Sequence, residues 1–183
     1  MDLDDVETIE FNALGGADNI VVGDLSGTDV TRVDLDLAGP GGGGDGAADT
    51  VTVNATQGDE VFAVAGGAAF GGVFVVNLHT TVNIFNSEAE NDRLVINGQG
   101  GRDVIDATNL AADGIQLTMN GGLGNDVFLG SQGDDLINGG DGDDVAFMGA
   151  GDDTFVWNPG DDNDTLEGQA GFDRMLFNGS NAA

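Results

Sequence analysis

Cysteine and tyrosine are absent from this chain, and it contains only one histidine and one tryptophan. Without cysteine the chain has neither a disulfide framework nor a thiolate ligand for a metal. The lone histidine, His79, lies in the stretch VNLHTTVNIF and has no cysteine with which to form a zinc site. Oxygen atoms are therefore the metal ligands that this sequence offers.

Positive charge is also scarce. The chain has 33 acidic residues against four basic ones, all of them arginine, so its formal net charge is -29. A surface of this sign repels nucleic acid and anionic lipid, so we predict neither as a partner. It attracts cations instead.

Long apolar runs are missing as well. No run approaches the roughly 18 residues that would indicate a membrane-spanning helix, so membrane insertion is not predicted. The first residues, MDLDDVETIEF, do not resemble a signal peptide and are already strand-like, and the last are LFNGSNAA. We therefore expect both ends to be cuts through a longer repeat protein.

Short runs rich in Val, Ile, Phe and Thr recur throughout, separated by Gly, Asn and Asp. This pattern is typical of strands joined by turns, and no stretch keeps a helical period for long. Strands are predicted at residues 6–11, 19–22, 32–37, 50–53, 60–64, 73–78, 81–85, 93–96, 103–106, 115–119, 126–129, 135–137, 144–147, 153–157, 164–167 and 174–177.

A nonapeptide repeat occupies residues 121–156: GGLGNDVFL, GSQGDDLIN, GGDGDDVAF and MGAGDDTFV. Each block has Gly at place four, Asp at place six and an apolar residue at place eight. After the two-residue insertion Trp157–Asn158 the repeat continues as PGDDNDTLE and GQAGFDRML. Since no block can bury its apolar residue alone, the repeat predicts a stacked solenoid with one continuous core.

The last three residues of each block are expected to form a strand, and the glycines let the first six turn sharply. Two blocks, about 18 residues, then complete a coil, and equivalent turns stack about 4.8 Å apart. The residues expected to point into the core are Phe128, Ile137, Ala146, Phe155, Leu166 and Met175.

This stacking brings like charges together. Asp126, Asp144 and Asp164 fall on one side of the solenoid, and Asp135, Asp153 and Asp173 fall on the other. Two carboxylates about 4.8 Å apart repel by about 3.5 kcal/mol at an effective dielectric constant of 20. Carboxylate and turn carbonyl oxygens favour calcium over zinc, copper or magnesium. We therefore predict two rows of calcium ions and, because the core is thin, folding that is coupled to metal binding.

These blocks resemble the RTX family (repeats in toxin, or haemolysin-type calcium-binding repeats), whose signature is G-G-x-G-x-D-x-U-x. The match is strong over residues 121–156, fair at 98–106 and 159–176, and weak before residue 97. The resemblance implies that carbonyls at places two and four join the Asp at place six. The implied metal ligands are Gly122, Gly124, Asp126, Ser131, Gly133, Asp135, Gly140, Gly142, Asp144, Gly149, Gly151, Asp153, Gly171 and Asp173. The predicted stack adds Asp164, and the fair match at 98–106 adds Asp103.

The predicted fold is an all-β, right-handed parallel β-roll or β-helix solenoid. Residues 1–97 are expected to form degenerate coils, and residues 98–183 a continuous RTX β-roll within the same elongated domain. The resemblance implies type I secretion from a Gram-negative bacterium, folding in extracellular calcium, and a role as a rigid segment of a larger secreted or cell-surface protein. An affinity of roughly 10⁻⁴ to 10⁻³ M suits that environment.

Several alternatives remain. Asp18, Asp49, Glu60 and Asp92 are expected to be solvated turn residues, since their glycine partners are incomplete. The Asn residues that follow strands are expected to be left-handed turn residues, with a stacked ladder as the second possibility. Those residues are Asn12, Asn54, Asn97, Asn120, Asn138 and Asn178.

Catalysis is not predicted, because the sequence lacks a recognisable set of acid, base and stabilising groups beyond the carboxylates that the repeat already explains. The alternative function is recognition of a glycan or a surface, as in an adhesin.

Overall fold

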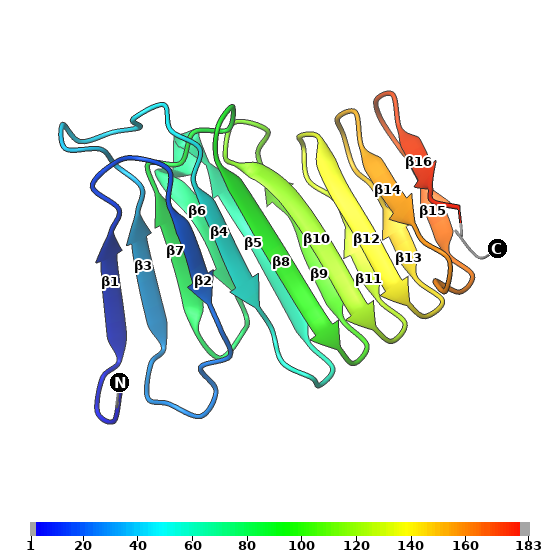
Figure 1. Ribbon diagram of the computed structural model, residues 1–183, viewed down its shortest axis with the longest axis horizontal. Coiled ribbons are helices and arrows are strands. Elements are labelled where there is room, and N and C mark those ends of the chain that lie inside the picture. The colour runs from blue at the N-terminus through cyan, green and yellow to red at the C-terminus, as the bar shows by residue number, and fades with distance from the viewer. Residues whose placement is uncertain (1–2, 180–183) are drawn as a thin grey trace.

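The computed structural model describes residues 3–179 and consists of two facing β-sheets of nine and seven strands (Figure 1). Every predicted strand is present. The strands are β1 (Thr8–Asn12), β2 (Asn19–Val22), β3 (Arg32–Asp36), β4 (Thr50–Asn54), β5 (Val61–Gly67), β6 (Gly72–Val76), β7 (Thr81–Phe85), β8 (Arg93–Gly100), β9 (Val104–Leu110), β10 (Gln116–Leu123), β11 (Val127–Leu129), β12 (Asp135–Asp141), β13 (Val145–Phe147), β14 (Thr154–Trp157), β15 (Thr165–Glu167) and β16 (Arg174–Phe177).

From β8 onward the chain alternates between the two sheets, so each pair of strands makes one coil of a parallel solenoid. Val127 of β11 pairs with Val145 of β13, and Asp126 bonds to Asp144, 18 residues further along the chain. The next pair of stacked aspartates, Asp144 and Asp164, is separated by 20 residues, because Trp157 and Asn158 are inserted. The predicted all-β parallel solenoid with two blocks per coil is confirmed.

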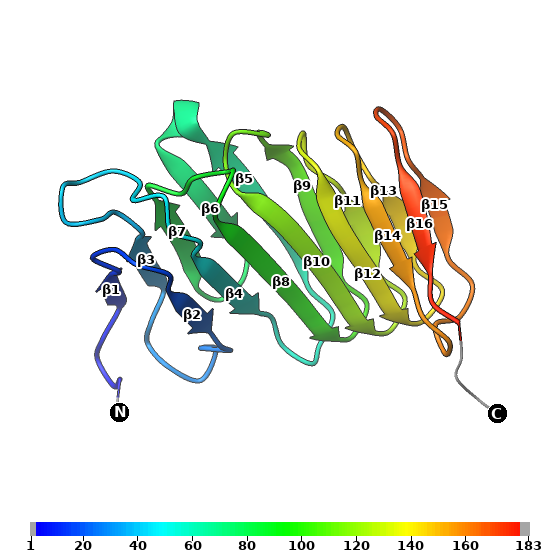
Figure 2. The same ribbon diagram turned by 45° about the horizontal axis from the view of Figure 1, so that its top comes forward.

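One segment departs from the parallel pattern. Strands β5, β6 and β7 form a meander within the nine-stranded sheet, and β6 runs antiparallel to both neighbours (Figure 2). A three-residue 3₁₀ turn, Ala68–Phe70, joins β5 to β6. Val73 and Val75 of β6 still point inward, so the reversed strand keeps the alternation that the core requires.

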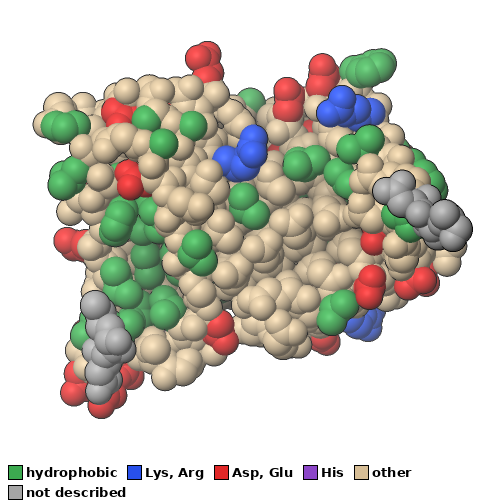
Figure 3. Space-filling view, in the orientation of Figure 1, with side chains coloured by type: hydrophobic (Ala, Val, Ile, Leu, Met, Phe, Trp, Pro, Cys, Tyr) green, Lys and Arg blue, Asp and Glu red, His purple; other side chains and the backbone are tan. Residues whose placement is uncertain are grey.

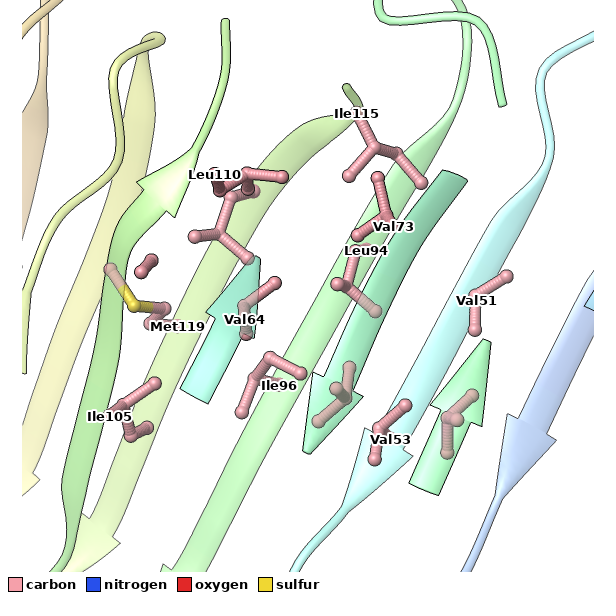
Figure 4. Close-up of a cluster of buried hydrophobic side chains, with 14 of the residues drawn as sticks. Val51, Val53, Val64, Val73, Leu94, Ile96, Ile105, Leu110, Ile115 and Met119 are labelled. Atoms are coloured by element: carbon pink, nitrogen blue, oxygen red, sulfur yellow. The ribbon is translucent and has the colours of Figure 1, made fainter. Parts of the chain in front are cut away.

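The core lies between the sheets, where alternate residues of facing strands interdigitate (Figure 4). Four predicted core residues, Phe128, Ile137, Ala146 and Phe155, are fully buried, and Leu166 packs against them while partly exposed. The prediction for Met175 was wrong, since 49% of this residue is exposed. It lies on β16, an edge strand that no further strand of residues 3–179 covers.

For the strand-end asparagines the first expectation, a left-handed turn, was wrong, and the second possibility, a stacked ladder, is observed for several of them. None of the six has a positive φ angle. They lie on the outer face of the seven-stranded sheet or at strand ends, and several form a ladder: Asn97 Nδ2 donates to Asn54 Oδ1, and Asn120 Nδ2 donates to Asn97 Oδ1, both at 2.8 Å. A side-chain bond to the neighbouring coil replaces the local turn that the single sequence suggested.

The division of the chain at residue 97 falls inside β8, and strands from both predicted segments belong to both sheets. Residues 1–2 and 180–183, the outer ends of those segments, lie outside the described residues. Within residues 3–179 no helix is long and apolar enough to cross a membrane.

Candidate metal centre

The turns bring backbone from successive coils into direct contact, and this explains the glycines at places two and four. Gly142 has φ 144°, and a Cβ added there would lie 1.9 Å from the carbonyl oxygen of Gly124. Gly140 has φ 99°, and its added Cβ would lie 2.2 Å from the carbonyl oxygen of Gly122. Only glycine fits at these two positions, and the stacked carbonyls face the seam between coils.

The first aspartate row runs along the start of strands β9, β11, β13 and β15. In it the backbone N–H of each Asp donates to Oδ1 of the Asp in the next coil. The distances are 2.8 Å from Asp103 to Asp126, 2.7 Å from Asp126 to Asp144, and 3.0 Å from Asp144 to Asp164. The row extends backwards as well, because Glu60 N–H donates to Asp103 Oδ1 at 2.8 Å.

The second row runs along the start of strands β12, β14 and β16. Asp135 N–H donates to Asp153 Oδ1 at 2.8 Å, and Asp153 N–H donates to Asp173 Oδ1 at 3.1 Å. The structure therefore places both predicted stacks of place-six aspartates in register. It also shows what the Oδ1 atom does, which is to tie one coil to the previous one.

The second carboxylate oxygen, Oδ2, is what makes these rows a candidate metal centre. It is buried and has no hydrogen-bond partner in Asp103, Asp126, Asp144, Asp153 and Asp164. In Asp126 it points into the turn, 2.1 Å from where a Cβ on Gly121 would lie. A buried anionic oxygen without a partner is strongly unfavourable unless a proton or a cation compensates it. The residues present therefore fit a bound cation.

Burial also raises the pKa of these carboxyl groups. Desolvation raises the pKa of Asp126 and Asp135 to about 7, and that of Asp103, Asp144 and Asp153 to about 6. Repulsion from neighbouring carboxylates adds to the rise, while bonds from backbone N–H groups oppose it. Removing water from the carboxylates is thus the main destabilising cost of the stack in the absence of metal.

A pH dependence follows for the metal-free protein. Because the folded pKa values lie above the usual value of 3.8, the folded state binds more protons than the unfolded state between about pH 4 and pH 7. Stability without metal is therefore expected to fall as the pH rises through that window. We expect a stronger far-UV strand signal at pH 5 than at pH 7.5 in chelator, measured by circular dichroism. An equal or weaker signal at pH 5 would contradict the desolvated-carboxylate account.

One predicted turn differs from the others. Ser131 donates to both oxygens of Asp135, from its backbone N–H to Oδ2 at 2.6 Å and from Oγ to Oδ1 at 2.8 Å. Asp135 consequently has no orphaned oxygen, and Leu117 is in register with it in the preceding coil, where an Asp would extend the row. Gly133 also lacks a positive φ angle. The metal role of Ser131, Gly133 and Asp135 stays a prediction.

The N-terminal half contains acidic positions that sequence reasoning misjudged. Asp18 N–H donates to Asp49 Oδ1 at 2.8 Å, and Asp49 N–H donates to Asp92 Oδ1 at 3.0 Å. Asp49 and Asp92 are each 2% exposed, so the expectation of solvated turn residues was wrong for them. The signal was present in the sequence, since each acid stands directly before a strand, but the missing glycines obscured it.

Carboxylates alone do not complete a site. Among residues 3–179 no group of three or more His, Cys, Asp or Glu side chains is placed to hold a metal ion. Any bound ion would therefore need backbone carbonyl oxygens or water as further ligands. Oxygen-rich coordination of this kind is typical of calcium, which accepts carboxylates, carbonyls and water in a flexible shell.

A parallel β-solenoid with glycine-rich turns and orphaned carboxylate oxygens defines a class of oxygen-ligand cation-binding repeat proteins. Comparison with protein-family models identifies the repeat: residues 120–155 and 159–175 match the RTX calcium-binding nonapeptide repeat, in four copies. The chain therefore contains RTX calcium-binding repeats, as the sequence predicted. Searches of the curated proteins and of the solved structures found no match.

Proposed function

We propose that this chain is a calcium-dependent structural module, which folds when several calcium ions bind its turns and then acts as a rigid segment of a larger secreted or cell-surface protein. The observation that supports this most directly is the set of buried Oδ2 atoms without a partner, five of which belong to the two aspartate rows and one to Asp18. The RTX repeat is a structural calcium-binding unit and not a catalytic one, which agrees with a non-enzymatic role.

The binding region extends beyond the matched repeats in this proposal. Residues 98–106, which precede the matched range, keep Gly101 at place four and Asp103 at place six. Gln99 takes place two with φ 76°, so a non-glycine residue adopts the turn conformation. Asp103 is 1% exposed and has an orphaned Oδ2, like the aspartates of the matched blocks.

An extracellular location is part of the same proposal. RTX repeats typically occur in secreted proteins. In type I secretion the chain would leave a calcium-poor cytosol unfolded. Extracellular calcium would then trigger its folding. Extracellular calcium modules bind with dissociation constants of roughly 10⁻⁴ to 10⁻³ M, which allows such a switch.

The test is a calcium titration of wild-type protein and of Asp144→Asn by isothermal titration calorimetry. Asp144 lies in the middle of the first row, so the variant is expected to bind fewer calcium ions with weaker affinity. Asp162→Asn is the matched control, because Asp162 is exposed and belongs to neither row. Undiminished calcium binding by Asp144→Asn, or no calcium binding by wild-type protein, would refute the proposal.

A further inference from the structure

The outer face of the seven-stranded sheet is unlike the rest of this acidic molecule. Apart from the exposed Asp141 at the end of β12, the outward positions of β4, β8, β10, β12, β14 and β16 include no aspartate or glutamate, although the chain has 33 of them. Thr, Asn and Gln fill most of these positions in β4, β8 and β10. In Figure 3 the acidic side chains gather near the outline of the molecule, and the middle is mainly uncharged.

A groove of about 590 Å³ crosses this face near the start of the strands. Its volume lies within the range of roughly 300 to 1,000 Å³ that is usual for small-ligand sites. Arg93 on β8 and Arg174 on β16 line it, and with four strand spacings between them they stand about 19 Å apart. Gln116, Thr118, Leu136 and Thr154 lie between the two arginines.

The two arginines have no carboxylate partner among residues 3–179, where the one ion pair joins Arg32 to Asp34. Arg93 Nη2 donates instead to Gln116 Oε1 at 3.2 Å, and Arg174 Nε donates to Thr154 Oγ1 at 2.9 Å. Neutral acceptors therefore hold both guanidinium groups on the face. Their remaining N–H groups are available to a ligand.

The wall of the groove supplies acceptors. Asp134 and Asp152 line it, and each uses Oδ1 to accept a backbone N–H, from Asp152 at 2.7 Å and from Phe172 at 2.9 Å. Their second oxygens accept no bond from the protein. The groove therefore presents donors along its floor and anionic acceptors along its wall.

We propose that this groove binds a neutral oligosaccharide. Asp134 and Asp152 would repel an acidic sugar, and the arginines would repel a cationic ligand. Sugar hydroxyls donate and accept at once, so a neutral chain satisfies both sides, while the half-exposed Leu136 offers contact to its C–H groups. A peptide is less suited, because the backbone groups of the inner strands are already paired and cannot bind an added strand.

The test screens calcium-loaded protein on an array of neutral, acidic and cationic linear oligosaccharides, then measures neutral hits by calorimetry. We expect a neutral glycan to bind, and Arg93→Ala and Asp152→Asn each to weaken it about tenfold or more. Arg102→Ala and Asp162→Asn make the same charge changes outside the groove and are expected to bind as wild-type protein does. Circular dichroism in calcium checks that all four variants are folded.

The proposal would be overturned if the protein bound no glycan, or bound only acidic or cationic glycans. It would also be overturned if the groove variants bound neutral glycans as tightly as wild-type protein does, or if a peptide bound in preference to neutral sugars. The proposal needs the folded solenoid but not any particular number of calcium ions. A failure of glycan binding with intact calcium binding therefore counts against the groove alone.

Discussion

Removal of calcium at neutral pH is expected to abolish most of the strand signal in far-UV circular dichroism, and added calcium is expected to restore it cooperatively. Without metal, the first row alone holds Asp103, Asp126, Asp144 and Asp164 in contact through backbone bonds. Each neighbouring carboxylate pair costs about 3.5 kcal/mol at a spacing of about 4.8 Å and an effective dielectric constant of 20. The three neighbouring pairs of this row together cost about 10 kcal/mol, which is as large as the usual net stability of a domain, about 5 to 15 kcal/mol.

Magnesium at the same concentration is the matched control for charge. It carries the same charge but requires a small octahedral shell and keeps its water, so it is expected to restore little of the signal. Sodium chloride at equal ionic strength controls for screening. A chelated protein that keeps its full strand signal at pH 7.5 would show that the aspartate rows do not depend on metal, and would exclude coupled folding.

The second large effect is expected from Gly142→Ala. The new Cβ would lie 1.9 Å from the carbonyl oxygen of Gly124, and the residue would have to keep φ at 144°. Backbone strain of about 1 to 3 kcal/mol and overpacking of about 1 to 3 kcal/mol together predict a loss of about 2 to 6 kcal/mol. Because the turn holds the carbonyls at the seam, we expect weaker calcium binding as well.

Two glycines separate the causes of that loss. Gly160 has φ 122° but an open environment, so Gly160→Ala is expected to show the strain alone. Gly27 has neither a positive φ angle nor a neighbouring atom within 4 Å, so Gly27→Ala is expected to be nearly neutral. Melting temperatures in saturating calcium provide the comparison. If Gly142→Ala were as stable as Gly160→Ala, the coils could move apart at that turn without any loss of folding free energy.

The regular part of the sequence was sufficient to predict the fold of that part. A nine-residue period with glycine, aspartate and an apolar residue at fixed places determines the coil length, the core residues and the stacking of Asp126 on Asp144, because each is a consequence of the repeat. Composition alone determined that metal ligands must be oxygen atoms, since cysteine is absent and histidine occurs once.

The contacts within the irregular coils could not be predicted from the sequence and became clear only in the tertiary structure. Asp49 and Asp92 lie in register although 43 residues separate them, because the β5–β7 meander is inserted between their strands. No periodic pattern reveals a partner at that distance. The first expectation for the stacked asparagines was wrong for the same reason, since a bond such as Asn97 to Asn54 exists only once the coils are stacked.

The sequence by itself determined the strands, the repeat, the acidic character and the choice of oxygen ligands, all of which are local properties of the chain. The tertiary structure decided which oxygens remain without a partner, as for Asp126 and Asp144 but not for Asp135, whose bonds come from Ser131. It also decided that Arg93 and Arg174 line one groove together with Asp134 and Asp152. Those properties depend on register between coils and on solvent exclusion, which exist only in the folded solenoid.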